Sequence, residues 1–205
     1  MKLIVGLGNP GEKYINVRHN LGFVIVEHFL KDFQNAKNTL WENQSKFKSE
    51  IAQIEWQPLH GSLEKVILAK PQTYMNNSGL AVKLITSYYK LITPDVWVIH
   101  DDIDLPLGSM KIRFGGASAG HHGVESIMEH LNTDKFWRFR MGTGAANGRL
   151  QMADGKLKNV EDYVLGNFVG QEKGKLKHLI KRGVKAIETG LEDAQDKAMN
   201  RFNTK

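Results

Sequence analysis

Several side chains able to carry out acid–base chemistry follow predicted strands in this sequence. His19 and Asn9 lie in the long polar loop after the first apolar run, Asn76 lies in the loop after the third, and Asp101 comes close behind the fourth. In open α/β sheets, ligands bind outside the carboxyl ends of the strands. We therefore expect these four side chains to meet at one edge of a sheet.

A histidine, a carboxylate and neutral amides suit a reaction in which a general base activates water. The sequence contains no cysteine and no Gly-x-Ser-x-Gly motif, so a covalent acyl-enzyme lacks an obvious nucleophile. His19 would take the proton, because an unperturbed imidazole titrates at about 6.5. Asp101 would orient that ring and stabilise its protonated form. Asn9 or Asn76 would donate an amide N–H to the developing oxyanion.

Each of these residues also has a structural explanation. The two asparagines could be ordinary turn and cap residues. Asp102 and Asp104 could bind a divalent metal, and His121 with His122 could be part of a zinc site, but neither pair has partner ligands nearby in the sequence. We therefore expect no metal and no other cofactor.

The glycines of the first loop offer a different interpretation. Gly6, Gly8 and Gly11 have the spacing of a dinucleotide-binding motif, in which the third glycine opens a helix under the pyrophosphate. Here Gly11 leads into residues 12–18, which have no helical stripe. A nicotinamide-dependent oxidoreductase is therefore the less favoured alternative.

Strands and helices alternate along the sequence, which is typical of an α/β fold. The run at residues 96–99 is apolar throughout, like a strand buried on both faces of a parallel sheet. Residues 110–114 look like a hairpin strand after it, and Asn76 to Ser78 should supply a helix N-cap. The predicted strands cover residues 3–5, 47–56, 64–69, 96–99, 110–114 and 136–141, and the predicted helices cover residues 21–33, 81–89, 124–131 and 171–202, the last as one helix or a helix pair.

Length and charge restrict the kind of protein further. A chain of 205 residues can fold as one domain, and we expect a single domain over residues 1–205. The formal net charge of +6 suits a polyanionic partner such as RNA, although a basic protein with a solvated surface would look the same. No apolar run approaches the length of a membrane span. We expect a soluble cytoplasmic protein.

Three long motifs in order resemble those of bacterial peptidyl-tRNA hydrolases. They are GLGNPG at residues 6–11 with Tyr14 and RHN at 18–20, KPQTYMNNSG at residues 70–79, and HDDIDLPLG at residues 100–108; the resemblance resumes at YVLG, residues 163–166. It implies a monomeric, single-domain α/β enzyme with a mixed, mostly parallel twisted sheet flanked by helices. Such an enzyme cleaves the ester between a peptide and the tRNA ribose, and so recycles tRNA from peptidyl-tRNA dropped by ribosomes.

The resemblance also implies roles for individual residues. His19 is then the base and Asp101 its orienting partner, while Asn9 and Asn76 lie beside the scissile ester and the peptide backbone. The other residues match positions that bind the substrate in the family. Tyr14 and Tyr74 match positions that contact it near the tRNA end, and the positions that hold tRNA phosphates are matched by Lys111, Arg113 and Arg140. Those three cations would add salt-dependent affinity without reading sequence.

Two departures from the family pattern lead to further expectations. Most relatives have asparagine where this chain has His122, so we expect His122 to keep the substrate-binding role with a steeper loss of affinity at low pH. The stretch at residues 145–158 is longer than usual, and we expect a mobile lid over the cleft. The main alternative of another class is a non-catalytic RNA-binding relative of the same fold.

Overall fold

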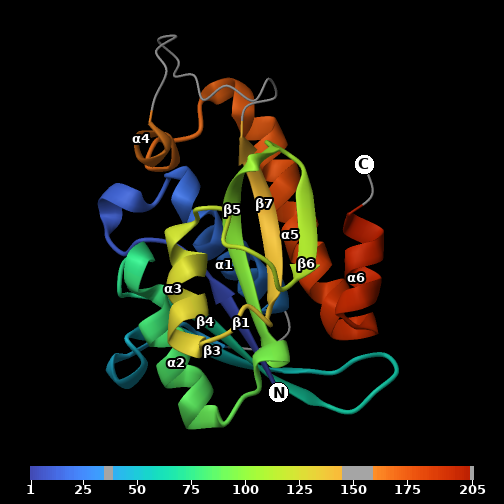
Figure 1. Cartoon of the computed structure of the whole chain (residues 1–205). Helices are drawn as coiled ribbons and strands as arrows, with labels where there is room; N and C mark the ends of the chain where they lie inside the picture. Colours follow the sequence, from blue (N-terminus) through green and yellow to red (C-terminus); the bar gives the residue numbers. More distant parts are fainter. Residues whose placement is uncertain (35–38, 145–158, 204–205) are drawn as a thin grey trace.

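A single mixed sheet organises the computed structural model, which describes residues 1–34, 39–144 and 159–203 (Figure 1). Its seven strands lie in the order β2-β3-β4-β1-β5-β7-β6. Four central neighbours, β4, β1, β5 and β7, run parallel, while β2, β3 and β6 add antiparallel pairs at the edges. The strands are β1 (Lys2–Gly6), β2 (Glu42–Gln44), β3 (Ser49–Trp56), β4 (Glu64–Pro71), β5 (Val96–Pro106), β6 (Met110–Phe114) and β7 (Trp137–Gly144).

Helices cover both faces of this sheet. Alternate side chains of β1 point to opposite faces, and each face carries an apolar core that the helices bury. Ile4 belongs to one core, beneath α1 (Leu21–Gln34), α5 (Lys173–Asp193) and α6 (Gln195–Phe202). Leu3 and Val5 belong to the other, beneath α2 (Ser78–Tyr89) and α3 (His122–Leu131). The short helix α4 (Val160–Val164) lies beyond the end of the sheet (Figure 1). The expected α/β fold is confirmed.

The glycines of the first loop allow close packing at the end of β1. A Cβ added to Gly6 would lie 2.4 Å from the carbonyl oxygen of Gly22, and one added to Gly22 would lie 2.3 Å from that of Ile99. Gly11 is followed by a 3-10 turn, η1 (Glu12–Tyr14), and α1 begins only at Leu21. The loop therefore carries a second 3-10 turn, η2 (Arg18–Asn20), across the ends of the parallel strands instead of opening a nucleotide-binding helix.

Two predictions about β5 and β6 are wrong. The strand does not end at Ile99 but continues to Pro106, so Asp101 lies within β5. It can do so because β7 supplies a parallel partner up to Gly144 and the polar side chains find hydrogen-bonding partners. In addition, β6 forms no hairpin with β5: it pairs antiparallel with β7.

The start of α2 also differs from the prediction. Residues Met75–Asn77 form a 3-10 turn, η4, and the side chain of the N-cap residue Asn77 makes no capping bond. The N–H of Gly79 instead donates to Ser126 Oγ of α3 at 3.0 Å. A tertiary contact thus satisfies a donor that the sequence assigned to a local cap.

The C-terminal basic segment forms a helix pair, as one of the two predicted forms. Ala194, with φ of 92°, separates α5 from α6. Asn203 then forms hydrogen bonds with both backbone groups of Ile112 and so covers the outer edge of β6.

The expected lid at residues 145–158 falls outside the described residues. Among the described helices, none combines the length and the apolar character needed to cross a membrane.

Candidate active site

A hydrogen-bonded pair of asparagines fixes the loop that carries His19. The N–H of Asn9 donates to Asn20 Oδ1 at 2.8 Å, and Asn20 Nδ2 donates back to the carbonyl of Asn9 at 2.9 Å. Both residues are buried. The two bonds tie η2 to the end of β1, so His19 has a fixed position above the strand ends.

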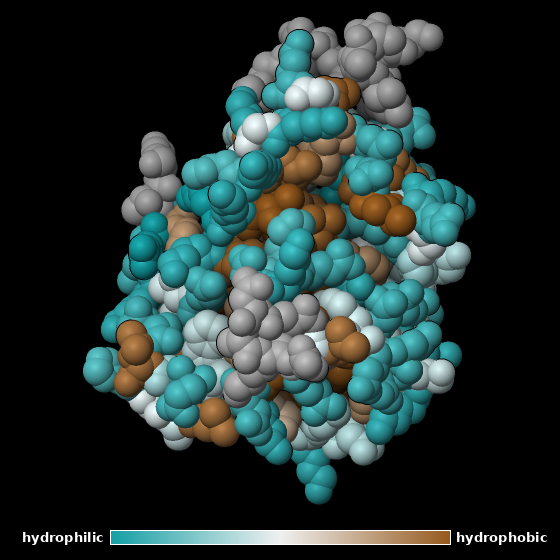
Figure 2. All heavy atoms as spheres, turned by 180° about the vertical axis from the view of Figure 1, so that it is seen from behind, coloured by the Kyte–Doolittle hydropathy of each residue, from teal (hydrophilic) through white to brown (hydrophobic). Residues whose placement is uncertain are grey.

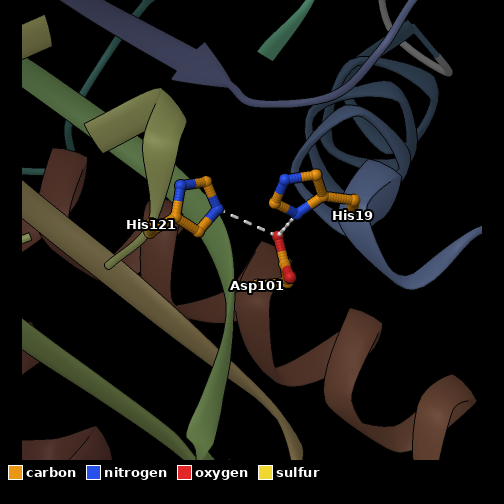
Figure 3. Close-up of side chains that lie close together, drawn as sticks. All are labelled: His19, Asp101 and His121. Atoms are coloured by element: carbon orange, nitrogen blue, oxygen red, sulfur yellow. Dashed lines mark hydrogen bonds and ion pairs between the residues drawn. The ribbon is translucent and has the colours of Figure 1, made fainter. Parts of the chain in front are cut away.

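The rings of His19 and His121, from separate parts of the chain, meet at one carboxylate oxygen of Asp101 (Figure 3). His19 Nδ1 lies 2.9 Å from Asp101 Oδ1, and His121 Nε2 lies 3.0 Å from the same atom. The rings of the two histidines are 4.8 Å apart, centroid to centroid. The sequence predicted the meeting of His19 with Asp101, but it assigned His121 no part in the catalytic group.

The hydrogen bonds define which nitrogen of each ring carries a proton. His121 Nδ1 accepts from the N–H of Val124 at the start of α3, so its Nε2–H donates to Asp101. His19 donates from Nδ1, which leaves the lone pair of the neutral ring on Nε2. Figure 3 shows this second nitrogen of His19 on the side of the ring away from Asp101.

Electrostatics in this cluster favour a charged carboxylate. Burial by itself raises the pKa of Asp101, but the two histidines and their hydrogen bonds hold it well below its ordinary value. Burial lowers the pKa of His19, and the charge and hydrogen bond of Asp101 outweigh that effect and raise it above the usual value. Asp101 is therefore ionised at neutral pH and stabilises a proton on His19.

A fourth side chain, His100, packs beneath this cluster and was missed at the sequence level. Its ring lies edge-on to His121, with 4.7 Å between centroids, and its Nδ1–H donates to the backbone carbonyl of Asp101 at 2.7 Å. Complete burial, together with nearby His121, sets the pKa of His100 well below its ordinary value. His100 therefore stays neutral and serves as packing beneath the charged group.

Asn9 is held with a defined amide orientation at the same place. Its Oδ1 accepts a hydrogen bond from the N–H of Met75 at 2.8 Å, so the bond to Met75 leaves the Nδ2 end of the amide unused. Tyr74, just before Met75, has φ of 61°, a value that costs a residue with a side chain on the order of 1–3 kcal/mol. The Tyr74 ring meets Tyr14 edge-on at 6.4 Å.

These groups line one cleft with a volume of about 890 Å³. His19, Asp101 and His121 form part of its wall, and α4 contributes apolar side chains to another part. The predicted residues that line it are Asn9, Tyr14, His19, Tyr74, Asn76, Asp101 and His122. The separate loops of the sequence thus meet at one edge of the sheet.

His122 reaches this cleft but belongs to a different part of it from His121. Its side chain is 75% exposed, and Nδ1 lies 3.6 Å from Glu125 Oε2 one turn along α3. His121 instead turns inward to Asp101. The two neighbouring histidines therefore do not act as a pair of ligands.

The three predicted phosphate-binding cations lie outside the lining of the cleft, on strands β6 and β7. Lys111 is paired in register with Arg140, and both Lys111 and Arg113 are exposed. Arg140 Nε contacts Asp102 Oδ2 at 2.6 Å, and Asp102 does line the cleft. Arg140 therefore borders the site through Asp102, whereas Lys111 and Arg113 lie on the strand beside it.

Metal binding has one candidate group among the described residues. His19, Asp101 and His121 offer ligand atoms that all lie within 4.8 Å of one another. The two shortest separations are those of N–H···O hydrogen bonds to a single oxygen, and a metal would have to displace both protons. Asp102, considered as a ligand with Asp104, uses one oxygen for the N–H of Asp104 and the other for Arg140.

Fold and site together define an α/β enzyme with a buried histidine–aspartate pair in the wall of a cleft. The family model for peptidyl-tRNA hydrolase matches residues 3–205. The chain belongs to the peptidyl-tRNA hydrolase family, whose members are ester hydrolases.

Individual relatives match over nearly the whole chain. Peptidyl-tRNA hydrolase of Dehalococcoides mccartyi is 39% identical over 203 residues, which are 99% of this chain and 100% of the relative. That of Bacillus subtilis is 38% identical over 210 residues and covers 100% of both chains. The crystal structure of the Acinetobacter baumannii enzyme has a TM-score of 0.82 and 29% identity over 100% of this chain and 95% of that one.

Proposed function

We propose that this protein hydrolyses the ester between a peptide and the ribose of tRNA, with His19 as the general base. One observation carries the mechanism: His19 Nδ1–H is bound to the buried, ionised Asp101, so Nε2 is the basic nitrogen. His19 also lines the cleft. The hydrogen bond to Asp101 gives His19 the tautomer that a base acting on water needs, and the charge of Asp101 together with that bond raises its pKa.

The proposed reaction needs only water and the substrate. Nε2 of His19 removes a proton from water as the oxygen attacks the carbonyl carbon of the ester. The tetrahedral intermediate then collapses, the bond to the ribose oxygen breaks, and the proton on His19 passes to that oxygen. The products are a peptide carboxylic acid, which ionises in solution, and a tRNA with a free ribose hydroxyl.

Amide groups of the cleft suit the oxyanion and the peptide backbone. Asn9 presents Nδ2–H because Met75 holds Oδ1, so no rotation of the amide is needed before it donates. Asn76 is exposed on the cleft wall and has both amide groups available for a peptide. We assign Asn9 to the oxyanion and Asn76 to the peptide.

The tRNA side of the site rests on aromatic and cationic groups. Tyr14 and Tyr74 form a pair in the cleft lining that suits the end of the tRNA. Lys111, Arg113 and Arg140 lie on neighbouring strands, and we propose that they bind phosphates of the same tRNA in a monomeric enzyme. A non-catalytic RNA-binding protein would have no use for an oriented base, so we favour the hydrolase.

The test is release of the acyl group from N-acetyl-aminoacyl-tRNA and from unblocked aminoacyl-tRNA by the purified protein. We expect cleavage of the blocked ester only, because groups that bind a neutral amide would be mispaired against a free ammonium. Binding of tRNA without cleavage of either ester would contradict the proposal and favour the RNA-binding alternative.

His122 allows a separate prediction about pH. In the structure its exposed ring faces Glu125, and protonation replaces a group that can accept a hydrogen bond with one that only donates. We expect the KM of the wild-type enzyme to rise at low pH, and the His122→Asn variant to lack this rise. An unchanged pH dependence of KM in the variant would contradict a binding role for His122.

A further inference from the structure

The first half of α5 concentrates positive charge on one surface of the protein. Residues 173–185 contain five lysines, one arginine and no acidic residue. The formal net charge of the whole chain is +6, so the rest of the chain carries equal numbers of cationic and acidic side chains. We call Lys173, Lys177, Lys181 and Lys185, which follow one another at intervals of four residues, the lysine row.

The lysine row faces solvent, opposite the side of α5 that packs on the sheet. Leu179, Val184 and Ile187 are buried in the core under α5, whereas all four lysines of the row are exposed. Residues four apart lie on neighbouring turns of the same helix side. The row extends for about 18 Å along the helix, from twelve residues at about 1.5 Å each.

This charge is not explained by ion pairing or by the stability of the helix. Lys185 contacts Glu188 at 2.9 Å, but in the part of the chain that the structure describes, Lys173, Lys177 and Lys181 form no ion pair. Like charges four residues apart repel each other by roughly 0.2–0.5 kcal/mol per pair. Cations in the first turns of a helix also oppose its dipole. An external anion would relieve both costs.

The start of α5 is joined to the loop that holds His19. Arg18, the residue before His19, contacts Glu172 at 2.7 Å and donates to the carbonyl of Asn167 at 2.6 Å. Figure 1 shows the beginning of α5 at the end of the molecule where α4 lies, and α4 lines the cleft. The lysine row therefore begins near the cleft and runs away from it along the side of the protein.

The exposed side of α5 is polar as well as basic. The large hydrophobic side chains exposed among the described residues all lie on other elements. Figure 2 shows the protein from behind relative to Figure 1. This face is mostly hydrophilic, and its hydrophobic residues gather in the upper half. A helix that binds a membrane surface needs exposed apolar residues beside its lysines. The partner is therefore better matched by a hydrated polyanion.

We propose that the lysine row binds the phosphates of the helical part of the tRNA, outside the cleft that receives the ester. The proposal rests on the proposed function in that tRNA is taken as the substrate. A nucleic-acid duplex as long as the row carries on the order of ten phosphates, enough for each lysine to bind one. Since Lys111 and Arg113 lie on β6, the row adds a second phosphate-binding surface.

The test compares two triple variants of equal charge. The first is Lys173→Gln with Lys177→Gln and Lys181→Gln; the control is Lys31→Gln with Lys65→Gln and Lys83→Gln, which are exposed lysines on α1, β4 and α2. Affinity for deacylated tRNA is measured against salt concentration. We expect the first variant to bind at least about tenfold more weakly at low salt. The slope of its plot of log K against log salt concentration should be smaller in magnitude by about 2–3, roughly one for each phosphate that is no longer neutralised. We expect the control to bind like the wild type.

A second substrate separates this proposal from the proposed function. The weaker binding should appear in KM for N-acetyl-aminoacyl-tRNA and be absent when the N-acetyl-aminoacyl group is carried by a short CCA oligonucleotide. Equal tRNA affinity in both variants, or loss only of binding to phosphatidylglycerol vesicles, would overturn the proposal even where the wild type cleaves the ester. Failure of the wild type to cleave would contradict the proposed function instead. Thermal melting of each variant checks that it folds.

Discussion

Replacing His19 by alanine is expected to lower kcat for N-acetyl-aminoacyl-tRNA by about 10²- to 10⁴-fold, the usual contribution of a general base. The variant loses the nitrogen that we propose takes the proton from water, while the loop stays in place through Asn9 and Asn20. KM should change little, since the role proposed for His19 is to act on water and not on the tRNA. The measurement is the initial rate of ester cleavage at saturating substrate.

A matched control separates this effect from a general loss of structure. His60 is exposed in the turn before β4, so His60→Ala should leave the rate unchanged. If His19→Ala retained kcat within a few-fold of the wild type while folded, His19 would not be the base.

The Asp101→Asn variant is expected to lose up to about 10⁴-fold in kcat, a loss of the size seen when the orienting acid of a catalytic triad becomes an amide. Asp101 Oδ1 accepts hydrogen bonds from two rings, and an amide offers one of its two ends as a donor. His19 would lose the charge that raises its pKa and the acceptor that selects its tautomer. The rate and the pKa of His19 should fall together.

The control for this variant is a neighbouring aspartate. Asp104 is exposed on the same strand, and Asp104→Asn should leave both the rate and the pKa of His19 unchanged. If Asp101→Asn remained as active as Asp104→Asn, orientation by Asp101 would not be part of the mechanism. A fall in kcat with an unaltered pKa of His19 would indicate a structural role for Asp101.

Much of this fold can be predicted from the sequence because its local patterns agree with its tertiary structure. The apolar runs around Leu3–Val5 and Val96–Ile99 predict inner strands, and they are central strands of the sheet. The amphipathic repeat at residues 21–33 predicts α1, which ends at Gln34. These segments satisfy their hydrogen bonds within regular elements, so a short window of sequence contains the needed information.

Other features depend on partners far away in the chain. Asp101 lies inside β5 because β7, some forty positions later, supplies the paired strand. His121 joins the site because α3 begins beside it and its Nδ1 accepts from Val124, so that Nε2 faces Asp101. The adjacent His121 and His122 suggested a shared role in the sequence, yet the start of a helix turns them in different directions. Spacing along the chain cannot reveal such choices.

The most direct test of the mechanism compares two titrations of the free enzyme. One is the pH dependence of kcat/KM for N-acetyl-aminoacyl-tRNA, which reports the essential base of the free enzyme. The other is the NMR titration of the His19 ring, assigned with the His19→Ala variant. Since Asp101 raises the pKa of His19, we expect both titrations to give one pKa above about 6.5, with activity lost as the pH falls through it. A kinetic pKa that differs from that of His19 would contradict the assignment of His19 as the base, and a His19 pKa below that value would contradict the effect of Asp101 on it.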